Sequence, residues 1–133
     1  PLYPLLKHKP EFLFEAAQSL SKTGQYEKAN EYLERAVLLS SDPMLYYVMA
    51  KNEQCLGEYR QAEKHLLHAI DILPERIYPY YLLMNLYTEP SYFQPAKLKM
   101  AIDSVLTKKP KVESSAIKEM KEKARSMLNN TSI

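Results

Sequence analysis

Residues 24–36 read GQYEKANEYLERA, and residues 57–69 read GEYRQAEKHLLHA. The glycine, the tyrosine and both alanines recur in the same order after 33 residues, and Leu33 returns with them as Leu66. A fixed period of this length is typical of repeat arrays, in which each unit is one supersecondary element that stacks on its neighbours. The two stretches therefore predict a repeat protein and not a catalytic fold.

A third and weaker copy is expected 34 residues after the second. In it, the positions of Tyr46, Met49, Ala50, Tyr59, Ala62 and Leu66 are taken by Tyr80, Leu83, Met84, Phe93, Ala96 and Met100. Met84 and Asp103 replace small residues of the earlier copies. The glycine turn is also lost, because Ser91 stands in its place within a loop bounded by Pro90 and Pro95. We expect family-specific contacts near this loop.

Apolar residues follow a helical period throughout, and each repeat divides into two helices at its glycine or at an equivalent break. Asp42 before Pro43 is a strong helix start, because aspartate accepts from free first-turn amides and proline fixes a helical φ. The expected helices span residues 11–23, 26–39, 43–56, 58–73, 77–87 and 95–109. We expect one domain over residues 1–133, with repeats at 10–42, 43–76 and 77–110.

The ends of the chain carry two further predictions. Residues 1–9 are interpreted as the end of a preceding helix, which suggests a segment of a longer protein. Residues 111–133 hold a capping helix, Ser115 to Leu128, and a tail. The capping helix is expected to cover the last repeat with one apolar face. That face contains Ala116, Ile117, Met120, Ala124, Met127 and Leu128.

Small residues recur where neighbouring helices must cross closely. Ala17, Ala29 and Ala36 occupy these positions in the first repeat, and Ala50, Ala62 and Ala69 occupy them in the second. Larger residues, such as Tyr26 and Leu33, are expected to fill the space between the helices. Replacing Ala62 by leucine should overpack the crossing and cost about 1–3 kcal/mol.

Composition excludes several classes of protein. The chain has 133 residues, one cysteine and two glycines, so neither a disulfide framework nor a four-cysteine metal site can form. Cys55 is expected to be a largely buried thiol. No apolar run approaches the length of about 20 residues that spans a bilayer. The net charge is +2, but residues 97–125 hold nine Lys/Arg against four Asp/Glu.

The repeat pattern resembles the tetratricopeptide repeat family over residues 10–109. The resemblance implies an all-α, right-handed solenoid of helical hairpins: here three repeats plus a C-terminal capping helix. It also implies that the first helices of the repeats line a groove for a protein or peptide segment. The groove residues carried over are Phe14, Gln18, Lys22, Tyr47, Lys51, Gln54, Tyr78, Tyr81 and Asn85, and adjacent offsets fall on Glu11, Met44 and Glu89.

Some family members clamp a carboxylate terminus with lysine, asparagine and arginine at set offsets. Phe14, Gln18, Lys51, Tyr78 and Tyr81 stand at the corresponding places here, so a clamp for chaperone tails is not expected. Aromatic residues suit a segment that presents apolar side chains, because they add contact area at low entropy cost. The competing interpretation is that these aromatics pack against neighbouring helices.

A narrower resemblance involves residues 10–20, 78–84 and 110–120, which read PEFLFEAAQSL, YPYYLLM and PKVESSAIKEM. They are similar to the C-terminal repeat region of membrane-embedded O-antigen ligase or polymerase proteins of Bacteroides-type bacteria. This resemblance implies a soluble appendage tethered at the bacterial inner membrane, whose glycan-transfer residues lie elsewhere in the parent chain. A free-standing cytoplasmic adaptor or co-chaperone-like scaffold is the alternative.

The sequence offers little that could carry catalysis. It has no phosphate-binding glycine loop, no nucleophile elbow and no paired carboxylates, so we expect neither an enzyme nor a cofactor. His65 and His68 share a helix face, but two ligands are too few for a metal site, and we place them on the outer side. Nucleic-acid binding is a minor alternative through the basic residues Lys97, Lys99, Lys108, Lys109, Lys111, Lys118, Lys121, Lys123 and Arg125.

Overall fold

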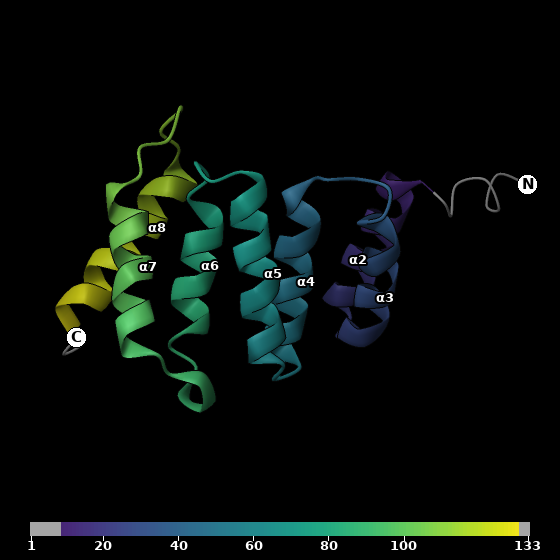
Figure 1. Ribbon diagram of the computed structural model, residues 1–133, viewed down its shortest axis with the longest axis horizontal. Helices are drawn as coiled ribbons and strands as arrows, with labels where there is room; N and C mark the ends of the chain where they lie inside the picture. The colour runs from purple at the N-terminus through teal and green to yellow at the C-terminus, as the bar shows by residue number, and fades with distance from the viewer. Residues whose placement is uncertain (1–8, 131–133) are drawn as a thin grey trace, which may run out of the picture. The chain divides into compact units, whose positions relative to one another are not determined.

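The computed structural model describes residues 9–130 of the chain. Within that range it contains seven α-helices, one short 3-10 helix and no β-strand, which confirms the all-α prediction (Figure 1). The chain forms two compact units, one up to Ile72 and one from Leu73 onward. The division falls at the end of α5, within the last residues of the repeat predicted at 43–76. Each unit holds its own set of packed helices.

The N-terminal unit consists of two helical hairpins. The first pairs α2 (Pro10–Lys22) with α3 (Tyr26–Ala36), and the second pairs α4 (Pro43–Cys55) with α5 (Tyr59–Ile72). The two hairpins stack through α3 and α4, and α2 also contacts α4. All six alanines expected at close helix crossings are buried at 2% exposure or less. The large residues Leu13, Leu33, Leu45, Met49 and Leu66 are buried in the same unit, and the first three alanines form one cluster with the first four of them.

Both hairpins turn at a glycine with a left-handed backbone. The φ angle is +82° at Gly24 and +78° at Gly57, values that side chains with a Cβ atom rarely adopt. The start of α4 is also as predicted, because the Asp42 carboxylate accepts a hydrogen bond from the Met44 amide at 3.0 Å. Local sequence signals thus set three of the boundaries in this unit.

A buried polar link joins the two hairpins of the N-terminal unit. The Asn30 side chain on α3 donates to the Met49 carbonyl on α4 at 3.2 Å. Asn52, one turn further along α4, donates to the Asn30 side-chain oxygen at 2.8 Å. Both asparagines are buried, and a buried amide without a partner would be costly. The link therefore favours one register between α3 and α4.

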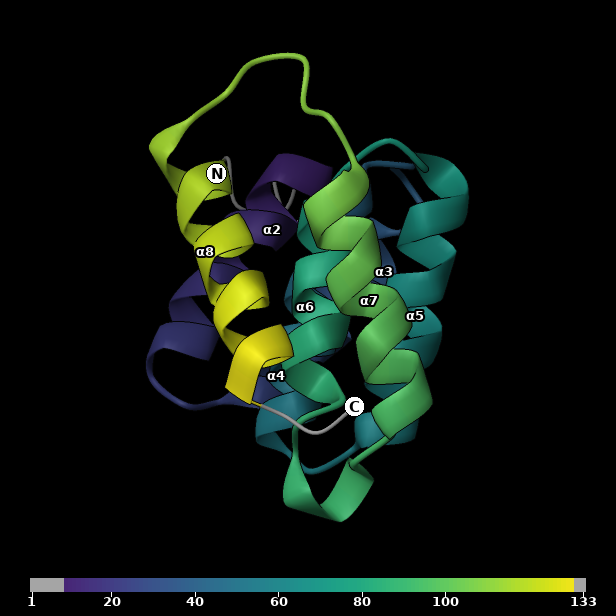
Figure 2. The ribbon, with the colours of Figure 1, turned by 90° about the vertical axis from the view of Figure 1, so that its left-hand side faces the viewer.

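The C-terminal unit contains α6 (Tyr78–Leu86), the 3-10 helix η1 (Pro90–Tyr92), α7 (Pro95–Thr107) and α8 (Ser115–Asn130). Helix α6 pairs with α7, and α8 packs mainly on α7 while also contacting α6 (Figure 2). This is the pattern in which α4 contacts α3 and α2 in the other unit. Helix α8 therefore takes the place of the first helix of a further repeat.

Lys121 fastens α8 to the end of α7. Its ammonium donates to the carbonyl oxygens of Val105, Leu106 and Lys108 at 2.9, 3.2 and 2.9 Å. The last carbonyls of a helix have no intrahelical donor, so a lysine from a neighbouring helix can satisfy them. The same ammonium also complements the negative end of the α7 dipole.

The third repeat departs from its predicted register. In its first helix the 34-residue spacing is confirmed, because Leu83 and Met84 are buried like Met49 and Ala50. In its second helix the spacing is wrong: Phe93 and Met100 are 48% and 69% exposed, and Ala96 is also exposed. The buried residues instead lie 36 positions after Ala62, Leu66 and Ala69, and they are Leu98, Ile102 and Val105.

The cause of this shift is the connection between the helices. Residues 56–58 join α4 to α5, whereas the longer segment 87–94, which includes η1, joins α6 to α7. Extra residues in the connection move the inward face of α7 along the sequence. Asp103, aligned with Ala69 by the shorter spacing, is accordingly exposed.

Two smaller predictions differ from the structure, and a third concerns residues outside the described range. The helix expected over residues 26–39 ends at Ala36, and Leu38 and Leu39 lie in a turn at 83% and 54% exposure. On α8, Ala124 is buried and Ile117, Met120, Met127 and Leu128 are half-buried, but Ala116 is exposed, contrary to prediction. The helix proposed for residues 1–9 lies outside the described residues, except for Lys9.

Candidate functional site

The first helix of each repeat carries the predicted groove residues, so we consider these helix faces one unit at a time. In the N-terminal unit, Gln18, Lys22 and Lys51 are exposed and Gln54 is half-buried. Phe14 is half-buried against the core of the unit. The face formed by α2 and α4 is therefore mostly polar at the positions that the resemblance selects.

Tyr47 differs from its neighbours on this face because its side chain is only 5% exposed. A tyrosine buried to this degree cannot offer a large contact area to a partner unless it moves. The competing interpretation, in which the aromatics pack against neighbouring helices, therefore fits Tyr47 and, in part, Phe14. Among the predicted groove residues of this unit, Gln18, Lys22 and Lys51 are the exposed ones.

In the C-terminal unit the predicted residues form an aromatic surface. Tyr78, Tyr81 and Asn85 on α6 are all half-buried. The rings of Tyr78 and Tyr81 stack with their centroids 6.4 Å apart and an interplanar angle of 22°. The Lys123 ammonium of α8 lies over the Tyr81 ring, 5.5 Å from its centroid. We call this surface, defined by Tyr78, Tyr81, Asn85 and Lys123, the α6–α8 face.

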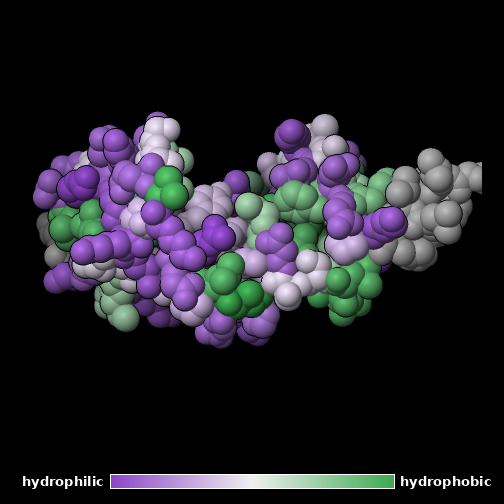
Figure 3. Space-filling model, turned by 90° about the horizontal axis from the view of Figure 1, so that it is seen from above, coloured by the Kyte–Doolittle hydropathy of each residue, from purple (hydrophilic) through white to green (hydrophobic). Residues whose placement is uncertain are grey.

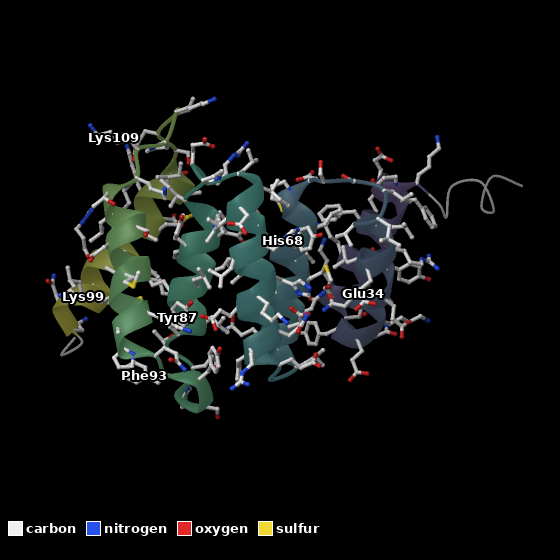
Figure 4. All side chains as sticks on the ribbon, in the orientation of Figure 1. Glu34, His68, Tyr87, Phe93, Lys99 and Lys109 are labelled. Atoms are coloured by element: carbon white, nitrogen blue, oxygen red, sulfur yellow. The ribbon has the colours of Figure 1, made fainter. Side chains whose placement is uncertain are left out.

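Several members of the basic cluster already serve the fold of the C-terminal unit. Lys121 caps α7, and Lys97 and Lys108 lie over the rings of Tyr87 and Tyr80 at 6.0 and 4.9 Å. By contrast, Lys99 and Lys109 point away from the helices (Figure 4). The lysines of the cluster therefore differ in their surroundings, and at least one of them, Lys121, is engaged in hydrogen bonds within the unit.

His65 is not on the outer side of its repeat, where the sequence placed it. Its Nδ1 atom lies 2.8 Å from a carboxylate oxygen of the buried Glu53, and its side chain is only 18% exposed. Tyr46 packs against both histidines, at 5.8 Å from the His65 ring and 4.6 Å from the His68 ring. Among residues 9–130, no three His, Cys, Asp or Glu side chains are arranged to hold a metal ion.

Cys55 is exposed, contrary to the prediction of a buried thiol. It ends α4 and hydrogen-bonds with the Tyr26 side chain, and this bond raises the pKa of the Tyr26 hydroxyl above its ordinary value. The charge on a Cys55 thiolate acts in the same direction. A hydroxyl that donates a hydrogen bond loses it on ionisation, which favours the neutral phenol.

Exposed apolar side chains gather at one connection of the N-terminal unit. Leu38 and Leu39 follow α3, and Met44, in the first turn of α4, is 42% exposed. Figure 3 shows hydrophobic residues reaching the surface over this unit, whereas hydrophilic residues dominate the same view of the C-terminal unit. None of the helices described in residues 9–130 has the length and apolar character to cross a bilayer.

Sequence reasoning missed two features of these surfaces. Lys123 was counted only as one of many basic residues, although it lies over Tyr81. Lys123 directly precedes Ala124, the buried centre of the α8 inner face. Adjacent helix positions are about 100° apart, so the sequence placed Lys123 at the border of that face, within reach of a neighbouring helix. The Glu53–His65 contact had no signal, since the two residues belong to different helices.

A comparison with family models matches residues 1–69 to the family described as "Anaphase-promoting complex, cyclosome, subunit 3", a family with repeats of the tetratricopeptide type. The matched range is just over half of the 133-residue chain and covers both hairpins of the N-terminal unit. No curated protein matches the chain.

Proposed function

This chain belongs to the anaphase-promoting complex, cyclosome, subunit 3 family of tetratricopeptide-type repeats, and on that premise we propose a non-catalytic module that binds protein or peptide segments. Repeats of this type generally bind protein partners. The description of the family names a subunit of a complex, and such a subunit must make protein contacts. We propose the same kind of role for this chain.

The observation that carries the proposal is the aromatic surface of α6. Tyr78 and Tyr81 stack on one another and are only partly buried, although α6 has a buried side of its own formed by Leu82, Leu83 and Leu86. Tyrosine is one of the residue types enriched among the side chains that contribute most to binding a partner. Their placement on the first helix of a repeat supports recognition at this surface.

We further propose that the first-helix faces of the two units are the binding surfaces, each considered separately. In the N-terminal unit the contact residues are Phe14, Gln18, Lys22, Lys51 and Gln54, with Tyr47 supporting them from its buried position. In the C-terminal unit they are Tyr78, Tyr81 and Asn85. The first surface suits polar contacts, and the second suits apolar ones.

Site-specific photocrosslinking tests this proposal. A benzophenone amino acid is placed at Gln18 or Tyr81 on first helices, and at Lys28 or Lys99 on second helices as matched exposed controls. In an extract of the cells that make the protein, we expect protein adducts from the first pair of positions and few from the second. Equal yields at all four positions would count against the first-helix faces. Circular dichroism checks that each variant keeps its helicity.

We also propose a cellular context, which rests only on the resemblance of residues 10–20, 78–84 and 110–120 to O-antigen ligase or polymerase proteins. In that context the chain is a soluble appendage of a parent protein in the bacterial inner membrane. A free-standing cytoplasmic adaptor is the alternative. The sequence of the gene upstream of Pro1 separates the two, because a membrane parent must encode several apolar segments of about 20 residues there.

A further inference from the structure

The α6–α8 face combines an uncharged helix with a single cation. Helix α6 reads YPYYLLMNL and contains no charged residue. The stacked pair Tyr78 and Tyr81 therefore supplies apolar contact area without any neighbouring carboxylate from its own helix. A partner segment that places an apolar side chain on these rings would lose little solvation, because no charge on α6 has to be buried.

The cation comes from α8. The Lys123 ammonium lies 5.5 Å from the centroid of the Tyr81 ring, and it forms no ion pair with any residue in the described range 9–130. Glu119, one turn earlier on the same helix, is within the usual reach of such a pair but does not form one. Lys123 is an exposed residue, so its ammonium is accessible to a partner while it lies over the ring.

The net charge around α7 and α8 has the same sign as the Lys123 ammonium. Residues 97–125 hold nine Lys/Arg against four Asp/Glu, so the field around α7 and α8 is positive. Such a field raises the local concentration of anionic segments and speeds their encounter. The charge complement of this surface is therefore a carboxylate adjacent to an apolar group.

We infer that the α6–α8 face takes an acidic segment, in which an aromatic or aliphatic side chain lies on Tyr78 and Tyr81 while a neighbouring carboxylate pairs with Lys123. This inference rests on the proposed function and specifies the chemistry of the partner at one surface. The aromatic contact supplies most of the affinity. The ion pair selects acidic over basic segments and makes binding sensitive to salt.

The test uses two defined probes, the peptide Gly-Ser-Glu-Glu-Phe-Glu-Glu-Ser-Gly and its counterpart with lysine at every glutamate. Each is titrated into the whole isotope-labelled chain and followed by amide NMR shifts. We expect the acidic probe to bind more tightly, with shifts centred on Tyr78, Tyr81 and Lys123. The variant Lys123→Glu should weaken the acidic probe about tenfold and reverse the preference between probes.

Lys118→Glu is the matched control, because it makes the same change in net charge on the same helix. Lys118 and Lys123 are five positions apart, which places them about 140° apart around α8. We expect Lys118→Glu to change the dissociation constant of the acidic probe less than twofold. An equal loss in both variants would reduce the effect to net charge and overturn the inference, as would shifts spread over other surfaces.

A third arm replaces the peptide with a short oligo(dT) single strand. Tighter binding of the DNA to the same face, lost in Lys123→Glu, would overturn the peptide inference in favour of nucleic acid. Lys123→Gln, which removes the charge but keeps an unbranched polar side chain, guards against a folding defect in the reversed variant. If neither probe binds but crosslinks still form at Gln18 or Tyr81, the inference fails and the proposed function stands.

Discussion

At the scale of single residues, the two turn glycines adopt a positive φ angle that the lack of a Cβ atom makes accessible. Gly57 has a φ of +78°, and a Cβ atom built on it would meet no atom within 4 Å. The space around the residue is open, so the glycine is needed for its conformation and not for close packing. The cost of any side chain here is therefore the intrinsic cost of the left-handed region.

We predict that Gly57→Ala lowers the free energy of unfolding by about 1–2 kcal/mol, the cost of the left-handed conformation for an alanine. Gly57→Asn should cost less, because asparagine visits this region more readily. Urea denaturation of the whole chain measures both. A loss below about 0.3 kcal/mol for the alanine variant would mean that the turn relaxes into another conformation.

Tyr26 provides a prediction about pH. Its hydrogen bond with Cys55 raises the pKa of the hydroxyl above the ordinary value near 10. Cys55→Ala should therefore lower the Tyr26 pKa, while Cys55→Ser, which keeps an acceptor, should lower it less. Because the folded state holds this proton more tightly, the interaction is present below the ordinary pKa and is lost as the pH rises through the raised one.

NMR of tyrosine labelled at the Cζ carbon measures this titration directly, with Tyr26→Phe assigning the resonance. A Tyr26 pKa that is the same in all three proteins would show that the thiol does not hold the hydroxyl in solution.

Sequence patterns predicted residues well where the cause is local. Asp42 caps α4, and Gly24 and Gly57 adopt positive φ, because each signal lies within a few residues of its effect. The exposure of Cys55 was mispredicted, because burial depends on which helices cover a position. The predicted groove residues stay a prediction, and no pattern in the sequence distinguished the partly buried rings of Tyr78 and Tyr81 from the buried Tyr47.

At the scale of elements, a repeat pattern predicts that α7 and α8 are helices, but it does not predict which face of each helix is buried. The inward face of α7 is displaced because the 87–94 connection holds more residues than the glycine turn. A period copied from earlier repeats predicts the type of helix but not its rotation. Helix α8 occupies the position of the first helix of a further repeat: it contacts α7 and α6 with its apolar side and presents charges elsewhere.

We predict that Lys121→Ala loosens α8 from the rest of its unit. The substitution leaves the carbonyls of Val105, Leu106 and Lys108 without the shared ammonium, and hydrogen bonds from charged groups contribute about 1.5–3 kcal/mol each at most sites. Hydrogen exchange should show faster exchange throughout α8. The half-buried position and the overlap of the three bonds place the expected loss at about 2 kcal/mol in total.

Two variants make this prediction specific. Lys118→Ala removes an exposed lysine from the same helix and should leave exchange unchanged. Lys121→Met keeps the apolar stem of the side chain, so it separates packing from capping. If Lys121→Met exchanges like the unaltered protein, packing of the stem and not the cap holds α8.

At the scale of the whole molecule, the two compact units raise the question of whether they unfold together or separately, which can be measured. Repeat proteins bury their cores mainly between neighbouring elements, so stability is distributed along the chain. The N-terminal unit centres on residues such as Leu33, and the C-terminal unit on residues such as Ile102, each with 0% exposure. If the units hold separate cores, a substitution that destabilises one core should lower stability mainly within its own unit.

We predict a reciprocal pattern of hydrogen exchange for Leu33→Ala and Ile102→Ala. Each removes a fully buried side chain, which costs about 2–5 kcal/mol because a cavity is left in the core. Leu33→Ala should lower protection mainly in residues 10–72, and Ile102→Ala mainly in residues 78–130, because locally opening regions follow the contiguous core that stabilises them. Equal loss along the chain in both variants would mean that the units unfold as one. In that case a partner bound to α6 would stabilise the N-terminal hairpins as much as its own unit.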